Sequence, residues 1–400
     1  MKKLIYLLSL ITLFSCKKEL GGNESPINVP NSTIITGNIN TSTTLTSDKV
    51  WTLRGYVYVT DGAKLVIQPG TTIVSDIAEK GALCIERGAQ LIAEGTISKP
   101  IVFTSGKPDG QKAPGDWGGI VILGRARTNR SSEPTIEGGI GRMYGGTNDQ
   151  DSSGVLRYVR IEYAGVAAMP NSEINALTLG GVGSKTVLEN IQTIYANDDA
   201  FEFFGGTVIG KNLYAYATAD DDYDFDFGYT GTIVNSISKR DPLFVDNGDT
   251  GNGVECDNDG TGSTAQPTTH PKLNGVILIG PNSSTALANH NFGLRWRRAT
   301  QFTITNSKVI GYQKGGFSIE SNETAQFYKD GVSKFQNNEL QTFDLLLNFR
   351  STSTIFTVSQ IKEKSLLDGN KEVSYTQNQI DILSKPVWTN GWTRFPIKGY

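Results

Sequence analysis

The clearest pattern in the chain is an alternation of aromatic and acidic residues between residues 187 and 228. In two successive segments, apolar side chains occupy every second position and carboxylates stand between them. Because alternate residues of a β-strand point to opposite sides, the pattern predicts strands with one buried and one acidic face. The residues expected inside are Phe201, Phe203, Tyr223, Phe225 and Phe227, and the carboxylates expected outside are Glu202, Asp222, Asp224 and Asp226.

The two segments align when Phe201 is placed on Phe225, which puts Glu202 on Asp226 and Asp198 on Asp222. Similar strands recur at 254–257, 294–297 and 317–320, each after an apolar strand of its own. Short strands that repeat every 20 or so residues between Gly and Asn turns are typical of a solenoid. We therefore predict an all-β, right-handed parallel β-helix over residues 33–350. The turn-rich strands up to residue 105 are expected to form an N-terminal cap that leads into the first coils, and residues 351–400 a C-terminal cap.

The first 15 residues have the pattern of a secretory signal, with two lysines and an apolar run too short to span a bilayer. Residues 13–16, Leu-Phe-Ser-Cys, resemble the end of a bacterial lipoprotein signal. That resemblance implies that Cys16 is lipidated and attaches the protein to a membrane through lipid only. An ordinary signal peptide with a chance cysteine is the alternative. Residues 16–32 then read as a flexible tether.

Composition narrows the function classes. The net charge of −3 argues against binding of nucleic acid or of anionic lipid surfaces. Two histidines without a Cys-x-x-Cys pair argue against a transition-metal site. Cys84 and Cys256 alternate with charged neighbours, so both are expected to point inward as free thiols. Nothing in the composition indicates a second domain, and a monomer is expected.

Four motifs carry a family resemblance: IQPGTTI at 67–73, GAQLIAEGT at 88–96, PIVFTS at 100–105 and GDWGGIVILG at 115–124. They resemble a family of exported β-helical proteins and lipoproteins of Bacteroidota. The resemblance implies a pectate-lyase-like superhelix and a place in the cell envelope, as an outer-membrane lipoprotein. It implies no established activity.

Two insertions and the C-terminal segment stand apart from the repeat. Residues 125–154 and 246–272 are rich in Gly and polar residues, and loops of this size in a solenoid project from one face and often shape a cleft. Residues 359–367 and 378–383 have the spacing of short helices. Trp388, Trp392 and Phe395 are expected to plug the core of the terminal cap.

The acidic face raises a question of charge balance. Carboxylates stacked about 4.8 Å apart in neighbouring coils repel by roughly 3.5 kcal/mol a pair at an effective dielectric of 20. One answer is calcium, which binds six to eight oxygen ligands. Another is an arginine-paired ladder without a ligand, in which Arg295 and Arg297 balance Glu255 and Asp257. The candidate metal ligands are Asp198, Glu202, Asp222, Asp224, Asp226, Glu255 and Asp257.

Three functions are consistent with this face. The first is binding of a glycan or another extracellular polymer through Glu202, Asp224, Arg295 and Arg297, with calcium as the candidate cofactor. The second is a polysaccharide lyase or glycoside hydrolase on the same scaffold, with Arg295, Arg297, Asp198 and Asp222 as candidate catalytic residues. The order of 197–199, 220–222, His290 and 295–297 loosely resembles the polygalacturonases. The third is a purely structural or adhesive surface protein.

Overall fold

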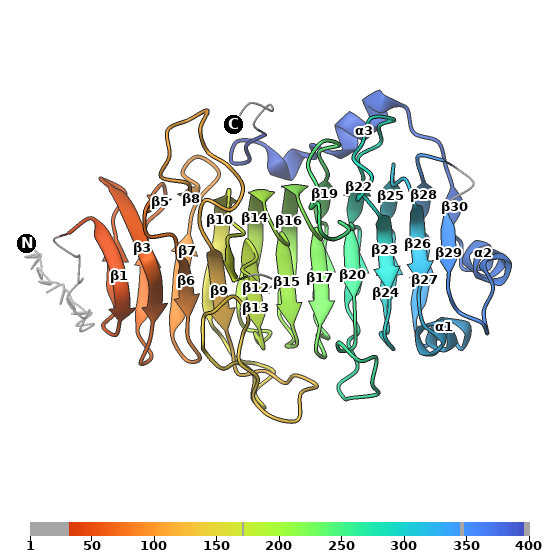
Figure 1. The fold of residues 1–400 in the computed structure, drawn as a ribbon, viewed down its shortest axis with the longest axis horizontal. Helices are drawn as coiled ribbons and strands as arrows, with labels where there is room; N and C mark the ends of the chain where they lie inside the picture. Colours follow the sequence, from red (N-terminus) through yellow and green to blue (C-terminus); the bar gives the residue numbers. More distant parts are fainter. Residues whose placement is uncertain (1–31, 170–171, 345–347, 396–400) are drawn as a thin grey trace, which may run out of the picture.

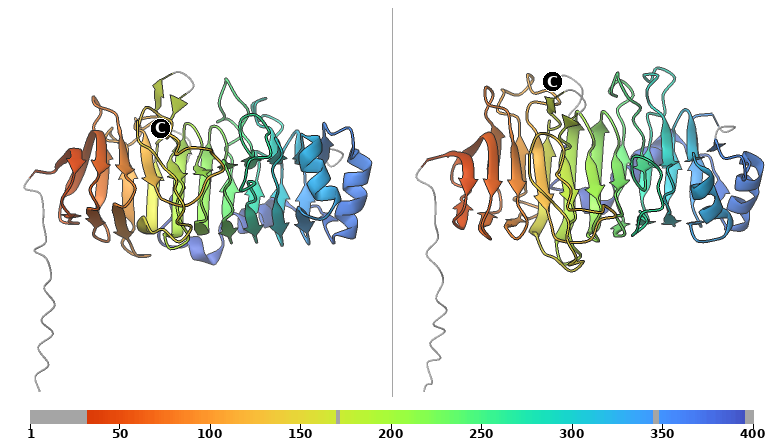
Figure 2. Two further views of the ribbon diagram at one scale, coloured as in Figure 1. Left: turned by 90° about the horizontal axis from the view of Figure 1, so that it is seen from below. Right: turned by 60° about the horizontal axis from the view of Figure 1, so that its bottom comes forward.

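The computed structural model describes residues 32–169, 172–344 and 348–395. In these ranges 28 strands form one sheet that winds as a right-handed parallel β-helix, which confirms the predicted fold (Figure 1). Each coil has three sides, here called the A, B and C faces, and equivalent strands of successive coils pair in parallel along each face. Two further views show the same elongated stack of coils (Figure 2).

The strands of each face follow the chain order of the coils. The A face contains β6 (Ala82–Ile85), β9 (Gly119–Leu123), β13 (Leu177–Gly180), β15 (Phe201–Phe204), β17 (Tyr223–Asp226), β20 (Val254–Cys256), β23 (Phe292–Trp296), β26 (Gly315–Ile319) and β29 (Phe349–Ser351). The B face contains β2 (Thr43–Leu45), β4 (Lys64–Ile67), β7 (Gln90–Glu94), β18 (Thr232–Val234), β21 (Lys272–Asn274), β24 (Thr303–Thr305) and β27 (Lys334–Gln336). The C face contains β5 (Thr72–Ser75), β8 (Ile101–Thr104), β19 (Ile237–Lys239), β22 (Ile277–Ile279), β25 (Lys308–Ile310), β28 (Glu339–Gln341) and β30 (Lys371–Glu372).

Longer strands cross a corner without a break. They are β1 (Ile34–Ile39) and β3 (Val50–Val59), which join the C and A faces, and β10 (Gly154–Glu162), β14 (Val187–Ala196) and β16 (Ile209–Thr218), which join the B and C faces. A separate antiparallel hairpin is formed by β11 (Ala167–Met169) and β12 (Ser172–Glu173). Residues 33–105, expected to form a cap, are therefore coils of the same helix.

In several coils the corner between the B and C faces is turned by a residue with positive φ. Asn190, Asn212 and Asn235 take this conformation at φ 56°, 55° and 50°. Asparagine tolerates the left-handed region better than most residues, which explains its recurrence at this point. The amide of Asn212 donates to Oδ1 of Asn190 at 2.9 Å, and that of Asn235 donates to Oδ1 of Asn212 at 2.6 Å. This column of amides holds successive coils in register.

The interior is one continuous apolar core, and the aromatic residues stack within it from coil to coil. Phe201 lies over Tyr223 with 5.4 Å between ring centroids, and Phe203 lies over Phe225 at 5.0 Å. The inward direction predicted for these four residues is thus confirmed. Phe227 is different, because its ring stacks on Phe204 outside the coil.

The predicted register between these two coils is wrong by two residues. Glu202 lies beside Asp224, not beside Asp226, because Phe201 pairs with Tyr223. The preceding ladder explains the difference. It runs from Val187 opposite Ile209 to Ala196 opposite Thr218 and allows no extra residues, so the turns that follow keep the same offset. The similar strings FEF and FDF in the sequence therefore do not occupy equivalent positions.

The two described cysteines are both free and buried. Cys256 points into the core as predicted. Cys84 does not: Leu83 and Ile85 point inward, whereas Cys84 faces outward under insertion residues such as Ile136 and Ile140. Burial raises the pKa of the Cys84 thiol to about 12, so this thiol stays protonated at neutral pH.

The C-terminal segment caps the last coils and then turns back along the outside. The helices are α1 (Asn322–Lys329), α2 (Val358–Leu367), α3 (Gln377–Leu383) and the 3₁₀ turn η2 (Val387–Thr389). Both short helices predicted after residue 350 are confirmed. From α3 the chain returns toward β16 and β10 (Figures 1 and 2). Trp392 is fully buried there, edge-on to Tyr158 at 5.7 Å, so it packs on the outer wall and does not plug the coil interior.

Candidate functional site

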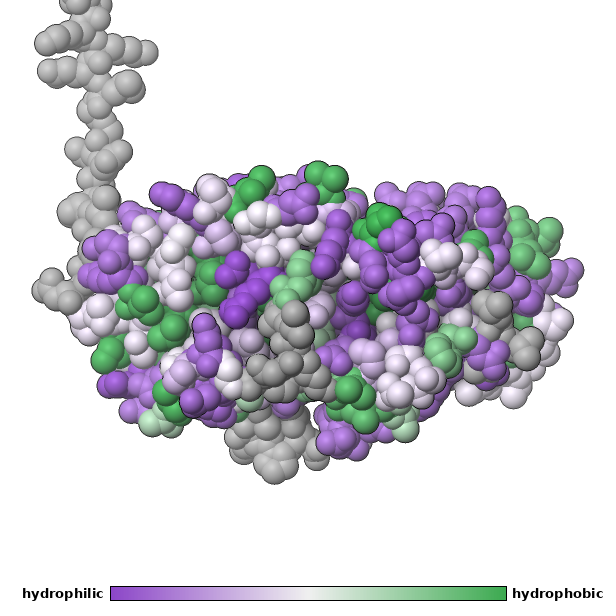
Figure 3. Space-filling model, turned by 90° about the horizontal axis from the view of Figure 1, so that it is seen from above, coloured by the Kyte–Doolittle hydropathy of each residue, from purple (hydrophilic) through white to green (hydrophobic). Residues whose placement is uncertain are grey.

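An acidic cleft lies on the outside of the A face, near the middle of the β-helix. Its volume is about 230 Å³, and nine of its ten lining residues are aspartate or glutamate. The lining residues are Glu137, Asn175, Asp198, Asp199, Glu202, Asp220, Asp221, Asp224, Asp249 and Glu255. The surface seen from above is largely hydrophilic, with apolar residues in small separate groups (Figure 3).

Three parts of the chain build the cleft. Neighbouring strands β15, β17 and β20 place Glu202, Asp224 and Glu255 side by side in register. The turns that enter β15 and β17 supply the pairs at 198–199 and 220–221. The two insertions contribute Glu137 and Asp249, so both long loops do shape a cleft.

The carboxylates approach one another closely in two overlapping groups. Oxygens of Asp198, Asp199 and Asp220 lie within 4.8 Å of one another, and so do oxygens of Asp199, Glu202 and Asp224. Calcium–oxygen distances are about 2.3–2.6 Å, so two ligands of one ion lie at most about 5 Å apart. Both groups therefore have the spacing of calcium ligands, with Asp199 common to the two.

Burial and like charge disfavour ionisation in the cleft. Burial, followed by the charges of Asp198 and Asp220, raises the pKa of Asp199 well above its usual range. The pKa values of Glu202 and Asp224 are raised in the same way, first by burial and then by neighbouring carboxylates. These carboxyl groups can lie so close together only when bound protons or a cation offset their negative charge.

Hydrogen bonds and ion pairs provide little of that compensation. The amide of Asn175 donates to Glu202, and the backbone N–H of Asp221 donates to Asp199 Oδ1 at 2.8 Å. Asp224 Oδ1 and Asp226 Oδ1 are buried and accept no hydrogen bond from the described residues. Among the described residues, no Lys or Arg forms a salt bridge with Asp199, Glu202 or Asp224. The upstream half of the acidic face is thus short of positive charge.

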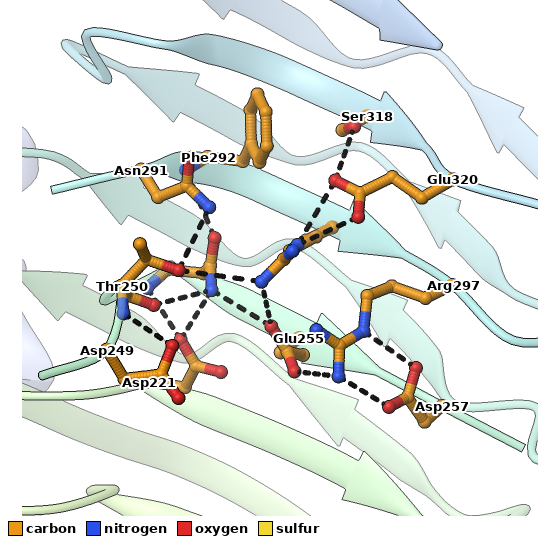
Figure 4. Close-up of polar contacts among 12 residues, drawn as sticks. Asp221, Asp249, Thr250, Glu255, Asp257, Asn291, Phe292, Arg297, Ser318 and Glu320 are labelled. Atoms are coloured by element: carbon orange, nitrogen blue, oxygen red, sulfur yellow. Dashed lines mark hydrogen bonds and ion pairs between the residues drawn. The ribbon is translucent and has the colours of Figure 1, made fainter. Parts of the chain in front are cut away.

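In the downstream half of the acidic face, at β20, the carboxylates are paired with arginines, as in the arginine-paired ladder that was one of the two predicted ways to balance the charge. Arg295 Nη1 lies 2.8 Å from Glu255 Oε2, and Arg297 Nη2 lies 2.6 Å from both Glu255 Oε1 and Asp257 Oδ2 (Figure 4). Arg298 also contacts Asp257 at 2.6 Å. Although burial opposes its charge, the ion pairs with Asp257 and Glu255 raise the pKa of Arg297. A guanidinium held protonated in this way is a poor proton acceptor, which weighs against Arg297 as the base of a lyase.

Asp222 and His290 lie away from the cleft, and the outward direction predicted for Asp222 is wrong. Asp222 is fully buried inside the coil, 3.1 Å from Arg240 Nη1. Arg240 Nε also donates to His290 Nδ1 at 3.2 Å. Burial raises the pKa of Asp222 to about 6, and burial together with Arg240 lowers that of His290 to about 3. Asp222 directly precedes β17, which begins at Tyr223, so the alternation along that strand does not extend to Asp222, and its side chain enters the core, where it belongs to this buried network.

Several cleft residues were not among the sequence candidates. They are Glu137, Asn175 and Asp249, together with Asp199, Asp220 and Asp221, which were considered only within the runs 197–199 and 220–222. The runs at 198–199 and 220–222 carried a usable signal, since both stand directly before an A-face strand. The two insertion residues carried none, because the path of a long loop depends on distant contacts.

Comparisons with known proteins agree with the architecture. The family model of the pectate-lyase-like β-helix domain matches residues 37–393. The chain belongs to this family. The comparison with curated proteins gave no match, and the comparison with solved structures gave none. Membership in the pectate-lyase-like family supports a polysaccharide-related or structural role. None of the helices in the described ranges is long and apolar enough to cross a membrane.

Proposed function

We propose that this pectate-lyase-like β-helix binds Ca²⁺ in the acidic cleft and, through the bound ion, a glycan or another extracellular polymer. Asp199, Glu202, Asp224 and their neighbours supply the carboxylate oxygens, and the polymer completes the coordination of the ion. Arg295 and Arg297 border the same face as fixed cations. We further propose that the protein is a lipoprotein of the outer membrane, attached through Cys16, which lies outside the described residues.

The observation that carries the proposal is the close like charge of Asp199, Glu202 and Asp224, which form no salt bridge with the described Lys and Arg residues. Two ionised carboxylates whose oxygens lie within 4.8 Å of one another repel by at least roughly 3.5 kcal/mol at a dielectric of 20, and Asp199 belongs to two such groups. A folded protein keeps such a cluster at a cost in stability, and costly clusters of this kind concentrate at binding and catalytic sites. Ca²⁺ favours this donor set, since it takes only oxygen ligands and tolerates irregular geometry.

Calorimetric titration of Ca²⁺ into chelator-treated protein tests the first half of the proposal. One or two ions are expected to bind, and replacement of Asp224 by Asn is expected to weaken binding at least tenfold. Asp61→Asn is the matched control, because Asp61 is an exposed turn residue outside the cleft. A glycan array probed with and without Ca²⁺ tests the second half. Wild type that binds neither ion nor glycan would leave a structural or adhesive role.

A hydrolase is the second candidate, and the raised pKa values favour it. A carboxyl group held protonated near neutral pH is suited to act as a general acid. The spacing argues against an inverting mechanism, because the oxygens of each group lie within 4.8 Å, closer than the roughly 6.5–9.5 Å between the carboxyl groups of inverting glycosidases and nearer the roughly 5–5.5 Å of retaining ones. New reducing ends from a panel of neutral and acidic polysaccharides, formed without unsaturated product and lost on Asp199→Asn, would establish hydrolysis. Absence of new ends, with Ca²⁺-dependent binding retained, would establish binding alone.

A further inference from the structure

A second cleft lies between the 125–154 insertion and the turn that follows β6. It is larger, about 680 Å³, and is called here the arginine cleft. Three arginines and two glutamates supply its charged groups, so its formal charge is positive where that of the acidic cleft is strongly negative. The lining residues are Glu86, Arg87, Arg125, Glu133, Gly141, Arg142, Met143, Gly145, Gly146, Thr147 and Asn148.

Two of the three arginines are held in place by the protein itself. Arg87 Nη1 lies 2.7 Å from Glu133 Oε2 and donates to the carbonyl oxygen of Gly145 at 3.0 Å. Arg142 pairs with Glu86, and its guanidinium lies 4.2 Å from the ring centroid of Tyr58. These pairs join the insertion to the wall of the coil and neutralise both charges. They give the cleft fixed walls, which reduces the entropy lost when a ligand binds.

Arg125 differs from the other two. Its guanidinium makes one hydrogen bond, from Nη2 to the carbonyl oxygen of Arg87 at 3.5 Å, and among the described residues no carboxylate lies within salt-bridge distance of it. The side chain is exposed at the cleft. Gly88 makes room for it: a Cβ at that position would lie 2.6 Å from Arg125 Nη2. The chain thus places one planar cation, with most of its five N–H donors unused, in the lining of a preformed cleft.

We propose that the arginine cleft is a second ligand site, which binds an anionic saccharide without a metal ion. The anionic group, a carboxylate, sulfate ester or phosphate, pairs with Arg125, because a guanidinium matches the two oxygens of such groups. Glu86 and Glu133 stand within the cleft as acceptors for sugar hydroxyls. Met143, which is 47% exposed, offers an apolar surface to the sugar ring. The volume lies within the range of about 300–1,000 Å³ that is usual for small-molecule sites.

Calorimetric titration in the presence of chelator tests this inference separately from the calcium proposal. The probes are a disaccharide that contains a uronic acid, a disaccharide with a sulfate ester, a sugar phosphate, and an uncharged disaccharide. At least one anionic probe is expected to bind, at least tenfold more tightly than the uncharged one, and the class that binds identifies the anion. Chelator removes any contribution of the acidic cleft, so failure of calcium binding does not affect the result.

Substitutions assign the binding to Arg125. Arg125→Ala is expected to lower the affinity for the anionic probe about tenfold, and Arg125→Lys is expected to restore part of it, because the charge is kept but the planar fork is lost. Arg350→Ala is the matched control, since the guanidinium of Arg350 likewise donates to a backbone carbonyl, that of Lys314, and β29 lies near the opposite end of the β-helix. Equal binding by wild type and Arg125→Ala, equal affinity for charged and uncharged probes, or no binding of any probe would each overturn the inference.

Discussion

Replacement of Asp199 by asparagine tests the charge balance of the acidic cleft most directly. Asp199 belongs to both groups of close carboxylates, so the substitution removes one charge from each. The change is otherwise conservative. An asparagine Oδ1 still accepts the hydrogen bond from the N–H of Asp221, which is 2.8 Å in the native structure. Any effect on stability or on ion binding therefore reports mainly on charge.

The expected size follows from the distances. One ionised pair within 4.8 Å costs at least roughly 3.5 kcal/mol at a dielectric of 20, but the raised pKa values mean that the neighbours are partly protonated. The expected gain for the calcium-free protein at pH 8 is therefore smaller, about 1–3 kcal/mol. For 400 residues the unfolding entropy is about 0.8 kcal/mol/K, so a gain of 2 kcal/mol raises the Tm by about 2–3 °C.

The assay is thermal unfolding with and without Ca²⁺, followed by a calcium titration. In chelator, Asp199→Asn should melt above wild type. In millimolar Ca²⁺ the order should reverse, because wild type is stabilised by the ion and the variant binds it at least tenfold more weakly. The control Asp61→Asn should follow wild type in both conditions. A variant that melts below wild type in chelator, or that keeps the full calcium-induced shift, would refute the reasoning.

Four further predictions follow from other parts of the molecule. Burial and neighbouring carboxylates raise the pKa values of Asp199, Glu202 and Asp224 well above their ordinary range, so the folded protein holds protons that the unfolded chain releases; the stability of the calcium-free protein should fall as the pH rises above about 4.5, and denaturant titrations at pH 5 and pH 8 check this. Arg297→Lys loses the planar guanidinium that bridges Glu255 and Asp257, so it should lower the free energy of unfolding by about 1–3 kcal/mol and leave the calcium affinity within about twofold of wild type. If wild type instead produces the ultraviolet absorbance of unsaturated products and the variant does not, the protein is a lyase. Trp392→Ala should cost about 3–5 kcal/mol locally and expose residues after α3 to limited proteolysis, with calcium binding retained; resistance equal to that of wild type would contradict the packing described. Cys16→Ala should move the mature protein from the membrane fraction to the soluble fraction, and unchanged membrane association would disprove lipid anchoring.

The sequence predicted the features of the fold that depend on neighbouring residues. Phe201, Phe203, Tyr223 and Phe225 point inward because alternation along a strand is a local property, and the repeat of that alternation was enough to predict the β-helix. The alternation did not predict the register between β15 and β17. Two strings of similar letters favoured one alignment, whereas the ladder from Val187 to Ala196 imposes another.

At the candidate site, too, features set by neighbouring residues or by the repeat were predictable, and features set by distant contacts were not. The pairing of Arg295 and Arg297 with the acidic residues of the preceding coil was predictable, because they occupy equivalent strands one repeat apart. Asp222 was misplaced because the alternation was extended one residue too far, since β17 begins only at Tyr223 and Asp222 belongs to the turn before it. Glu137 reaches the cleft only through the path of a long insertion, and contacts of that kind leave no periodic signal in a sequence.

The returning C-terminal segment has a consequence for the order in which the protein folds. In most solenoids each repeat contacts only its neighbours, so the contact order is low and coils can form one after another. Here Arg160 donates to the carbonyl oxygen of Trp392 across 232 positions, and Tyr214 donates to that of Ser384 across 170. These contacts cannot form until residues 384–392 have been made. The coils can therefore assemble from residue 33 onward before the segment after α3 packs on them, and that segment then links the unfolding of the middle coils to that of the C-terminal coils.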